Sequence, residues 1–499
     1  MSAFPKAICG ADDLKGRFLE AERSMEPGRV VLEEMPRAAV LQREFRASHC
    51  SYCFTSIDKS SETIQCSACG EETFCSSICK SLARNEYHWL ECQHKDLLDQ
   101  LGPEAVLALR LLLADEPDNI KTSERKRAKI EKFDKWPSDF DLVSSLMTHE
   151  NRRSEKEIGH YRKVARELVQ VTSTSSNESW SSIDKDVLFG FVMRHLLQIQ
   201  CNVHAITALV VDRREMGDHV ETQNQVRLAL AIYPRASLLN HSCDPNVIVS
   251  YERRKLFVRT LKSVSKGDEL LHCYGPHCAR MRFRERRKAL REQYYFDCVC
   301  SACSTEEASE RELGHRFVDL FVCGRCNGLL KACDDENVGS CSTCKKSFIM
   351  KKKFDNYDAA QKIFDAAEVH KENNDFDRAL TKYHQCLKIH KSLLHKSSKT
   401  LGRTHDSIAE VYANLGLFKK ASEHCQASCV TVELIFGEAS MELANELLKL
   451  AQLYFNSRQA KEALQMARRG LSIFSRYCDN TDERIIELKE MENFLEQIK

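Results

Sequence analysis

The sequence predicts a multidomain α+β protein, and three observations support this fold class. Short runs typical of β-strands occur near the N-terminus and again within residues 228–275. The 24 cysteines concentrate in residues 50–92, 298–303 and 323–344, where their spacing indicates zinc modules. Apolar residues at spacings of three and four predict helices within 97–206 and again beyond the last cysteine cluster. At 499 residues the chain is long enough for about three domains.

Composition and charge exclude several classes of protein. The net charge is +1, and no run reaches the ~18 apolar residues of a membrane span, because Arg110 interrupts the most apolar stretch, Ala105–Ala114. The first ten residues lack the charged-then-apolar order of a signal peptide. We therefore expect a monomer in the cytoplasm and nucleus, without membrane association. Because thiols stay reduced there, the cysteines indicate metal binding rather than disulfides.

The two β-rich segments are defined by strand and turn signals. In the N-terminal segment, Arg29–Leu32 and Ala38–Leu41 follow a turn at Pro27-Gly28. In the second segment the predicted strands are Leu228–Ile232, Val247–Tyr251, Leu256–Val258 and Glu269–Cys273, with turns at 244–246 and 266–268. Strands are therefore expected in both segments, on either side of the cysteine-rich and helical segments.

The final third of the chain contains an internal repeat. Two series of alanines recur every 42 residues: Ala367, Ala409 and Ala451, and Ala379, Ala421 and Ala463. Each pair brackets a turn-like segment, at 373–375, 414–416 and 456–458. Small residues at two fixed places let antiparallel helices approach closely, as in tetratricopeptide-type hairpins, and the long period predicts long helices or loops. A non-repetitive helical bundle is the alternative.

A charged stretch at 121–135 interrupts the earlier helical segment. We interpret it as a solvated loop or helix face, with a nuclear-import signal at Lys126-Arg127 as the alternative.

The first cysteine cluster predicts two zinc ions. Its eight candidate ligands are Cys50, Cys53, Cys66, Cys69, Cys75, Cys79, His88 and Cys92. Thiolate and imidazole suit tetrahedral Zn²⁺, and so short a segment needs metal to fold. The spacing resembles the MYND finger, whose interleaved pairing would place Cys50, Cys53, Cys75 and Cys79 on one zinc and Cys66, Cys69, His88 and Cys92 on the other. The resemblance implies a structural module or a docking surface for proline-containing peptides.

Two further clusters follow. Cys298, Cys300 and Cys303 supply three ligands, so a structural zinc there requires a distant fourth. The last cluster has four ligands with the spacing of a small zinc ribbon, Cys323, Cys326, Cys341 and Cys344, and Cys333 lies in its loop as a bystander. The remaining cysteines, such as Cys201 and Cys386, are expected to be small core residues.

The most specific motif is Asn240-His241-Ser242-Cys243-Asp244-Pro245-Asn246. It resembles the NHSCxPN signature of SET-domain methyltransferases. Downstream, 266–275 is similar to the stretch that ends the SET core, and upstream Lys15-Gly16-Arg17-Phe18-Leu19 resembles its opening strand. With the MYND-like cluster inserted between them, these motifs resemble the SET and MYND domain family, most closely its fourth subtype. The resemblance covers nearly the whole chain.

This resemblance implies a domain plan. It comprises an N-terminal SET part (1–45), a MYND finger (46–95), a helical insert (96–206), the core SET (207–276), a post-SET zinc segment (277–304), a ribbon-like segment (305–350) and helical repeats (351–499). It also supplies Cys243 as the fourth ligand beside Cys298, Cys300 and Cys303. About four zinc ions per chain are therefore expected.

The resemblance further implies an S-adenosylmethionine-dependent protein-lysine methyltransferase. Tyr274 would be the essential tyrosine beside the transferring methyl group. The implied cofactor contacts are Lys15, Gly16, Arg17, His149, Asn202, Asn240, His241, Tyr274 and Phe296, and the implied lysine channel is Tyr274, Tyr294 and Phe296. A structural role is the alternative for His149 and Asn202, and Tyr294 and Phe296 could instead be core aromatics.

One residue departs from the family pattern. Phe18 stands where the opening strand commonly has a second glycine, so we expect a narrower or displaced cofactor site. The alternative function is a weakly active or inactive SET protein that acts as a MYND-mediated adaptor or co-repressor. Few cations lie within the MYND segment, so we do not expect sequence-specific nucleic-acid binding, and the predicted partner is a lysine-containing protein substrate.

Overall fold

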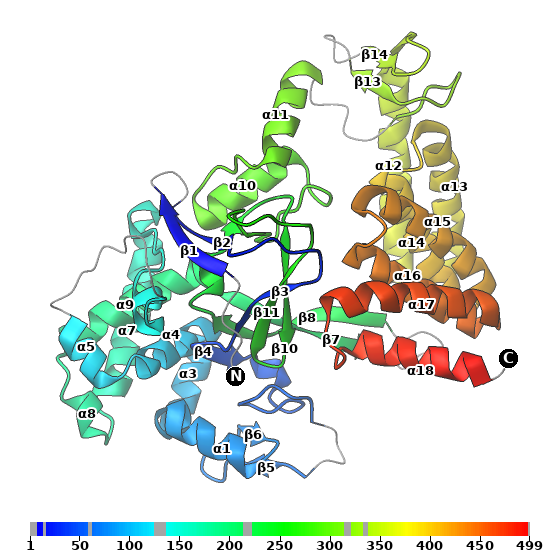
Figure 1. The fold of residues 1–499 in the computed structure, drawn as a ribbon. Helices are drawn as coiled ribbons and strands as arrows, with labels where there is room; N and C mark the ends of the chain where they lie inside the picture. The colour runs from blue at the N-terminus through cyan, green and yellow to red at the C-terminus, as the bar shows by residue number, and fades with distance from the viewer. Residues whose placement is uncertain are drawn as a thin grey trace. The chain divides into compact units, whose positions relative to one another are not determined.

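The computed structural model describes residues 7–12, 16–57, 62–123, 136–212, 222–313, 321–332 and 338–497 (Figure 1). The chain divides into two compact units. The first takes residues from the ranges 1–210, 224–277 and 284–298, and the second from 211–223, 278–283 and 299–499. Each unit is described by itself below.

The first unit contains the split β-domain. Its strands are β1 (Ala7–Asp12), β2 (Gly16–Ala21), β3 (Val30–Glu34), β4 (Ala38–Leu41), β7 (His204–Asp212), β8 (Thr222–Ile232), β9 (Asn240–His241), β10 (Val247–Glu252), β11 (Lys255–Thr260) and β12 (Leu271–His272). N-terminal β3 pairs with β11, and β4 pairs with β8, so strands about 200 residues apart share sheets. The short strand β9 lies parallel to β12. The prediction of one β-rich domain assembled from two distant segments is confirmed.

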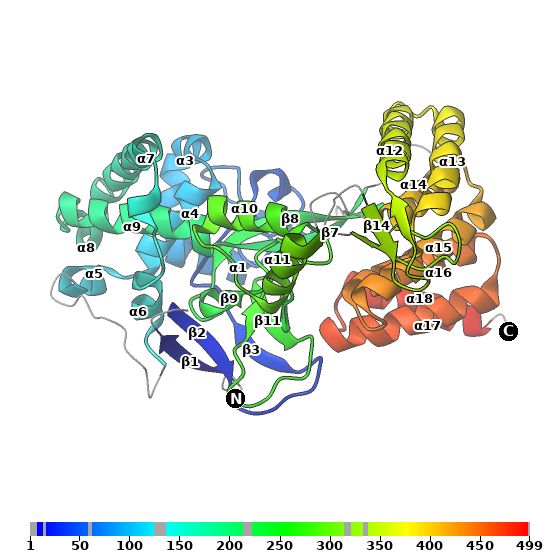
Figure 2. The same cartoon turned by 90° about the horizontal axis from the view of Figure 1, so that it is seen from above.

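The cysteine-rich module and the helical insert pack together within the same unit. The module contains β5 (Ile64–Gln65), β6 (Thr73–Phe74), α1 (Ser77–Ala83), a π-helical turn (Arg84–His88) and α2 (Trp89–Glu91). The insert contains α3 (Lys95–Leu101), α4 (Pro103–Ala114), α5 (Pro117–Ser123), α6 (Asp139–Ser144), α7 (Glu155–Ser173), α8 (Glu178–Ser181) and α9 (Lys185–Asn202). Helix α9 contacts both α4 and α7, and the three lie side by side (Figure 2).

Arg110, the charged residue that interrupts the most apolar helix, is buried and paired within the fold. It is buried in α4, and its guanidinium donates to both carboxylate oxygens of Glu91 at 2.7 and 2.8 Å. It also donates to the carbonyl of Ala39 at 2.6 Å and lies 3.5 Å from the ring centre of Tyr87. A buried charge is tolerated only when it is paired in this way. Arg110 therefore ties the helical insert to the cysteine-rich module and to β4.

Two sequence expectations in the first unit need correction. The helical segment ends at Asn202, and β7 begins at His204, so the predicted helical range extends a few residues too far. Strand β1 was not predicted at all, although it pairs along its whole length with β2. Of the charged stretch, 124–135 lie outside the described residues, and so do Lys126 and Arg127. Helix α10 (Phe283–Tyr294) follows the β-domain.

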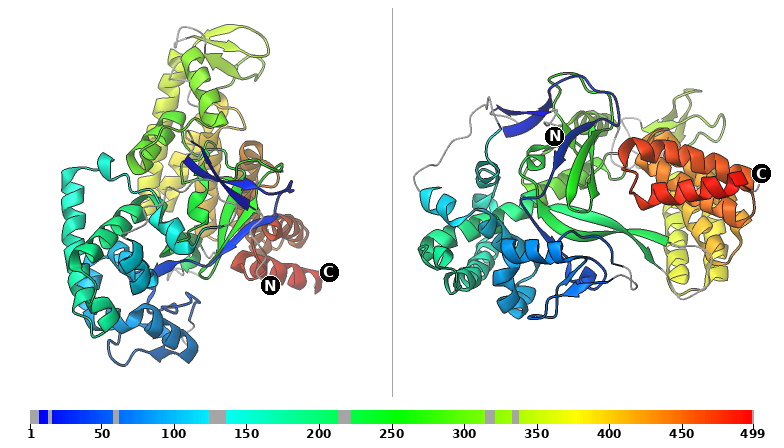
Figure 3. Two further views of the ribbon diagram at one scale, coloured as in Figure 1. Left: turned by 60° about the vertical axis from the view of Figure 1, so that its left-hand side comes forward. Right: turned by 60° about the horizontal axis from the view of Figure 1, so that its bottom comes forward.

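The second unit consists mainly of helical hairpins, drawn in yellow to red in Figure 3. After α11 (Ser301–Leu313) and a small sheet of β13 (Leu330–Ala332), β14 (Val338–Cys341) and β15 (Ser347–Ile349), seven helices run to residue 497. They are α12 (Lys351–Glu372), α13 (Phe376–Leu393), α14 (Lys399–Asn414), α15 (Phe418–Phe436), α16 (Met441–Asn456), α17 (Ala460–Tyr477) and α18 (Glu483–Gln497).

The 42-residue repeat is visible in both packing and backbone. All six repeat alanines are buried, at the close contacts of α12 with α13, α14 with α15 and α16 with α17. Asn374, Gly416 and Arg458, again 42 residues apart, all adopt the left-handed conformation, with φ of 57°, 70° and 62°. The predicted hairpins with turns at fixed positions are therefore confirmed. Among the described residues, no helix is long and apolar enough to cross a membrane.

Candidate functional site

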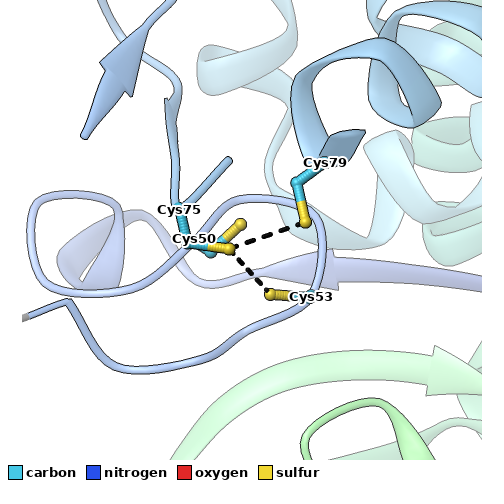
Figure 4. Close-up of side chains that lie close together, drawn as sticks. All are labelled: Cys50, Cys53, Cys75 and Cys79. Carbon is cyan, nitrogen blue, oxygen red and sulfur yellow. Dashed lines mark hydrogen bonds between the residues drawn. The ribbon is translucent and has the colours of Figure 1, made fainter. Parts of the chain in front are cut away.

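The first cysteine cluster forms two ligand groups with the predicted interleaved pairing. Cys50, Cys53, Cys75 and Cys79 face one another, with Cys79 on α1 and the others on the preceding loops (Figure 4). The Sγ–Sγ distances are 3.6 Å for both Cys53–Cys75 and Cys75–Cys79. A tetrahedral site with Zn–S bonds of about 2.3 Å has ligand separations of about 3.8 Å. These four thiols are therefore close enough to share one zinc ion.

The second group fits equally well. Cys66, Cys69, His88 and Cys92 come together, with Sγ of Cys66 and Cys92 3.7 Å apart and Sγ of Cys69 3.7 Å from Nε2 of His88. His88 Nδ1 is buried and has no hydrogen-bond partner among the described residues. The ring therefore presents Nε2 to the group.

The cysteines of the two remaining predicted zinc sites also lie close together. Sγ of Cys243 lies 3.9 Å from Sγ of Cys298, and with Cys300 and Cys303 these thiols form a group that could hold a metal. In the ribbon-like segment, Cys323 lies 3.8 Å from Cys344, and Cys326 lies 3.4 Å from Cys341. The backbone N–H groups of Arg325 and Cys344 donate to Cys323 and Cys341, which stabilises thiolates. Cys333 lies outside the described residues.

Tyr274 lies at the centre of an aromatic cluster. Its ring centre is 4.8 Å from that of Tyr294 and 5.2 Å from that of His241. Its hydroxyl donates to the carbonyl of Leu239 at 2.6 Å, which fixes the position of the phenol oxygen. The ring centre of Phe296 is 6.0 Å from that of His241. The predicted channel residues are therefore neighbours in one cluster, in which Tyr274 contacts Tyr294 and His241, and His241 contacts Phe296.

Burial governs the ionisation of both tyrosines. It raises the pKa of the Tyr274 phenol well above its usual value, and the nearby Tyr294 and Glu269 raise it further. Burial likewise raises the pKa of Tyr294 to about 12. Both phenols are therefore protonated at neutral pH, so neither can serve as a base.

His241 connects Tyr274 to the cysteine cluster. Its Nδ1 accepts from the backbone N–H of Tyr274 at 3.0 Å, and its Nε2 lies 3.3 Å from Sγ of Cys243. Because Nδ1 is an acceptor, the ring proton is on Nε2 and points at the sulfur. Donation to a metal-bound thiolate is a common way in which a neighbouring residue orients a ligand.

Asn240 holds the opening strand. Its side-chain amide donates to the carbonyl of Arg17 at 3.2 Å and to Oε1 of Glu269 at 3.0 Å. On that strand Gly16 has φ of +68°, and no atom of the described residues lies within 4 Å of where its side chain would be. Arg17 in turn hydrogen-bonds the hydroxyl of Ser145. Lys15, which precedes Gly16, lies outside the described residues.

The two remaining predicted cofactor residues lie at the end of α9 and on the loop that it contacts. Asn202, at the end of α9, donates to the carbonyls of Met147 and Gln198 at 3.0 and 2.7 Å. His149 has a left-handed backbone, and its ring centre is 5.2 Å from that of Tyr295. Asn202 therefore positions the loop that carries His149. Whether either residue contacts a cofactor stays a prediction.

The structure joins Arg17, Asn240, His241, Tyr274, Tyr294 and Phe296 into one network of hydrogen bonds and ring contacts. It includes three residues that the sequence did not indicate: Ser145, Leu239 and Glu269. Ser145 and Leu239 act through a hydroxyl and a backbone carbonyl, which no motif marks. Glu269 belongs to a matched motif but was not assigned a role there.

The side chain of Phe18 fits between strands β1 and β2 because a glycine lies opposite it. It lies directly opposite Gly10 in the β1–β2 register. A Cβ on Gly10 would come within 2.4 Å of the Phe18 ring, so the ring covers the position that a side chain would otherwise fill. The bulky residue on one strand is matched by a glycine on its partner.

Comparisons with known proteins identify the family of this chain. The SET domain family model matches residues 16–275, more than half of the chain. The human protein-lysine N-methyltransferase SMYD4 is 29% identical over 97% of this chain and 69% of its own length. The Arabidopsis thaliana histone-lysine N-methyltransferase ASHR1 is 23% identical over 90% and 87%, and mouse SMYD3 is 26% identical over 59% and 60%. The chain belongs to the SET-domain family, and along nearly its whole length it is similar to SMYD4 proteins, as the sequence resemblance to the fourth subtype of the SET and MYND domain family predicts.

Proposed function

We propose that this protein is an S-adenosylmethionine-dependent protein-lysine N-methyltransferase. The observation that carries the proposal is the network around Tyr274, in which the opening strand, the Asn240-His241 motif and the Tyr294–Phe296 segment converge. Relatives named as lysine methyltransferases match this chain over most or all of its SET region. The substrate is a lysine-containing protein.

The residues present fit such a cofactor. When bound, S-adenosylmethionine supplies an electrophilic methyl group on a sulfonium sulfur. Gly16 has a left-handed backbone and no side chain, and no atom of the described residues lies within 4 Å of its Cβ position, which allows close approach of a ligand to the opening strand. Asn240 fixes this strand through the Arg17 carbonyl. Gly16, Arg17, Asn240 and His241 would therefore line the cofactor site, largely through backbone groups, because the ring nitrogens of His241 are already engaged.

The aromatic cluster would orient and desolvate the incoming lysine. Tyr274 and Tyr294 provide apolar ring faces for an alkyl stem, and exclusion of water lowers the ammonium pKa. Because the Tyr274 hydroxyl donates to Leu239, its oxygen keeps acceptor capacity for a polarised methyl group. Alignment of amine, methyl and sulfur is the main contribution that such a site can make to the rate.

Neither tyrosine removes the lysine proton in this proposal. Burial keeps both phenols protonated at neutral pH. The lysine therefore releases its proton to solvent before it reaches the aromatic cluster. The role of Tyr274 is to position the reacting atoms.

The zinc clusters would hold the protein's parts in place. About four zinc ions per chain would bind at the two MYND groups, the post-SET group and the ribbon, and would stabilise each of them.

The MYND module also has exposed apolar residues. On α1 of this module, Ile78 and Leu82 are 69% and 39% exposed, one helical turn apart. They form an apolar strip that suits a proline-containing peptide.

We further propose that the protein resides in both the cytoplasm and the nucleus.

The experiment that tests the proposal is transfer of a radiolabelled methyl group from S-adenosylmethionine to lysine-containing proteins. Tyr274→Phe should lower the rate by about 100-fold or more, because small misplacements of the reacting atoms are that costly. Its cofactor affinity should stay within a few-fold of wild type. Tyr412→Phe, in the helical repeats, is the matched control and should retain full activity. An unchanged rate in Tyr274→Phe, or loss of rate and cofactor affinity together, would count against the assignment.

A further inference from the structure

A fifth group of candidate metal ligands lies in the helical repeats, away from the zinc clusters described above. Cys425 and Cys429 are one turn apart on α15, and both are buried. Glu446 faces them from α16, which packs against α15. The two sulfurs and one carboxylate oxygen of Glu446 all lie within 4.8 Å of one another. Two thiols and a carboxylate from facing helices thus share one buried place.

The two carboxylate oxygens of Glu446 differ in their contacts. Its Oε1 accepts from the ammonium of Lys449 at 2.8 Å, and Lys449 also contacts Asp406 at 2.6 Å. Oε2 is buried and accepts no hydrogen bond of ordinary geometry from the described residues, although the Ser428 hydroxyl lies close enough to interact with the carboxylate. A buried acceptor without a well-formed hydrogen bond is rare in folded proteins and often marks an unseen ion or water. This oxygen belongs to the same residue that faces the two thiols.

We propose that Cys425, Cys429 and Glu446 bind a divalent zinc-class metal ion through two thiolates and one carboxylate. Sulfur ligands favour Zn²⁺ over hard cations such as Mg²⁺ or Ca²⁺. Three protein ligands leave one position for water, as in three-ligand zinc sites generally. On binding, both thiols lose their protons to solvent, and the two thiolates and the carboxylate face the charge of the ion. The Lys449–Asp406 pair beside them is neutral overall.

The geometry needs only a small adjustment. Ligand atoms around a tetrahedral zinc are about 3.8 Å apart, against at most 4.8 Å here. Rotation of side chains on helices that already touch can close this difference. The ion would join α15 to α16 and so stabilise the boundary between the second and third hairpins of the repeat.

The test is the zinc content of the full-length protein, purified with zinc present and measured by elemental mass spectrometry. Cys425→Ser/Cys429→Ser should lose one zinc ion per chain relative to wild type. Cys386→Ser, which changes a buried thiol on α13 outside the group, is the matched control and should lose none. Equal zinc content in the wild type and the double variant would overturn the proposal. So would a wild-type mass two hydrogens lower, caused by a Cys425–Cys429 disulfide.

A second series keeps the proposal testable if the double serine variant fails to fold. Glu446→Gln should release one zinc ion at a lower chelator concentration than wild type, because it replaces an anionic ligand with a neutral one. Glu446→Cys should release that ion at a higher concentration, because it adds a third thiolate. Identical release curves for wild type and both variants would overturn the proposal. Methyl transfer is not needed as a readout, so the result is independent of the catalytic assignment.

Discussion

Replacement of His241 by phenylalanine should weaken both the fold and the zinc cluster beside it. The imidazole accepts from the backbone N–H of Tyr274 at 3.0 Å and directs its Nε2 proton at Sγ of Cys243, 3.3 Å away. Phenylalanine preserves most of the ring volume but removes both interactions. The change therefore separates hydrogen bonding from packing.

The magnitude follows from the two bonds. The neutral bond to the Tyr274 N–H contributes about 1 kcal/mol, and a bond to a charged thiolate contributes about 1.5–3 kcal/mol. Their loss should lower the free energy of unfolding by about 2.5–4 kcal/mol. Removal of such a neighbouring donor also typically lowers metal affinity about 10–100-fold.

Two measurements check this prediction. Urea unfolding of the wild type and His241→Phe gives the stability difference, and titration with a chromogenic chelator reports how readily the weakest zinc is released. His160→Phe, at an exposed position on α7, is the control and should leave both unchanged. If His241→Phe unfolded at the same urea concentration as the control and released zinc no more readily, the bridging role of His241 would be refuted.

Two further predictions concern the helical repeats. Arg458→Gly should raise the free energy of unfolding by about 0.5–1 kcal/mol, because arginine is disfavoured at φ of 62°. Asn374→Gly, at the equivalent turn, should change the free energy of unfolding less, because asparagine tolerates this conformation. Burial lowers the pKa of His405 and His424 to about 4, below the usual 6.5. Unfolded chains therefore bind more protons, and stability should fall as pH drops from 6.5 to 4, by at most about 1.4 kcal/mol per pH unit for each histidine and by less for the more exposed His424. Equilibrium unfolding at several pH values checks this, and a His405→Gln/His424→Gln variant with an unchanged pH slope would contradict it.

The zinc groups and the repeat were largely predictable from the sequence. Cysteine pairs at fixed short spacings leave few arrangements for a tetrahedral metal, so Cys323 with Cys326 and their two partners could be grouped in advance. The repeat was visible because close helix packing demands a small residue at the same place in every copy. The structure bears this out at Ala367 and its equivalents.

The contacts inside the site could not be predicted from the sequence. The Asn240 amide is directed to a carbonyl of the opening strand, more than 200 residues away, and backbone groups carry no residue signature. Strand β1 was missed because its short run around Gly10 has weak strand propensity and is stabilised by pairing with β2. The same pairing explains how the bulky side chain of Phe18 fits, because the strand register places Gly10 opposite it.

The fifth ligand group was overlooked for a similar reason. Cys425 and Cys429 lie on a helix at spacing four, which is also the spacing of core residues, and their facing carboxylate comes from the next helix. Only the packing of α15 on α16 brings the three together. Local sequence patterns therefore reveal sites built within one segment, whereas sites built between helices require the tertiary structure.

The proposed function requires the network around Tyr274 to bind a sulfonium methyl donor. Calorimetric titration of the zinc-loaded protein with S-adenosylmethionine measures this binding. We expect saturable binding of one cofactor per chain, and weaker binding in Asn240→Ala, which no longer holds the opening strand. A folded, zinc-loaded protein that takes up no cofactor at millimolar concentration would refute the proposed function.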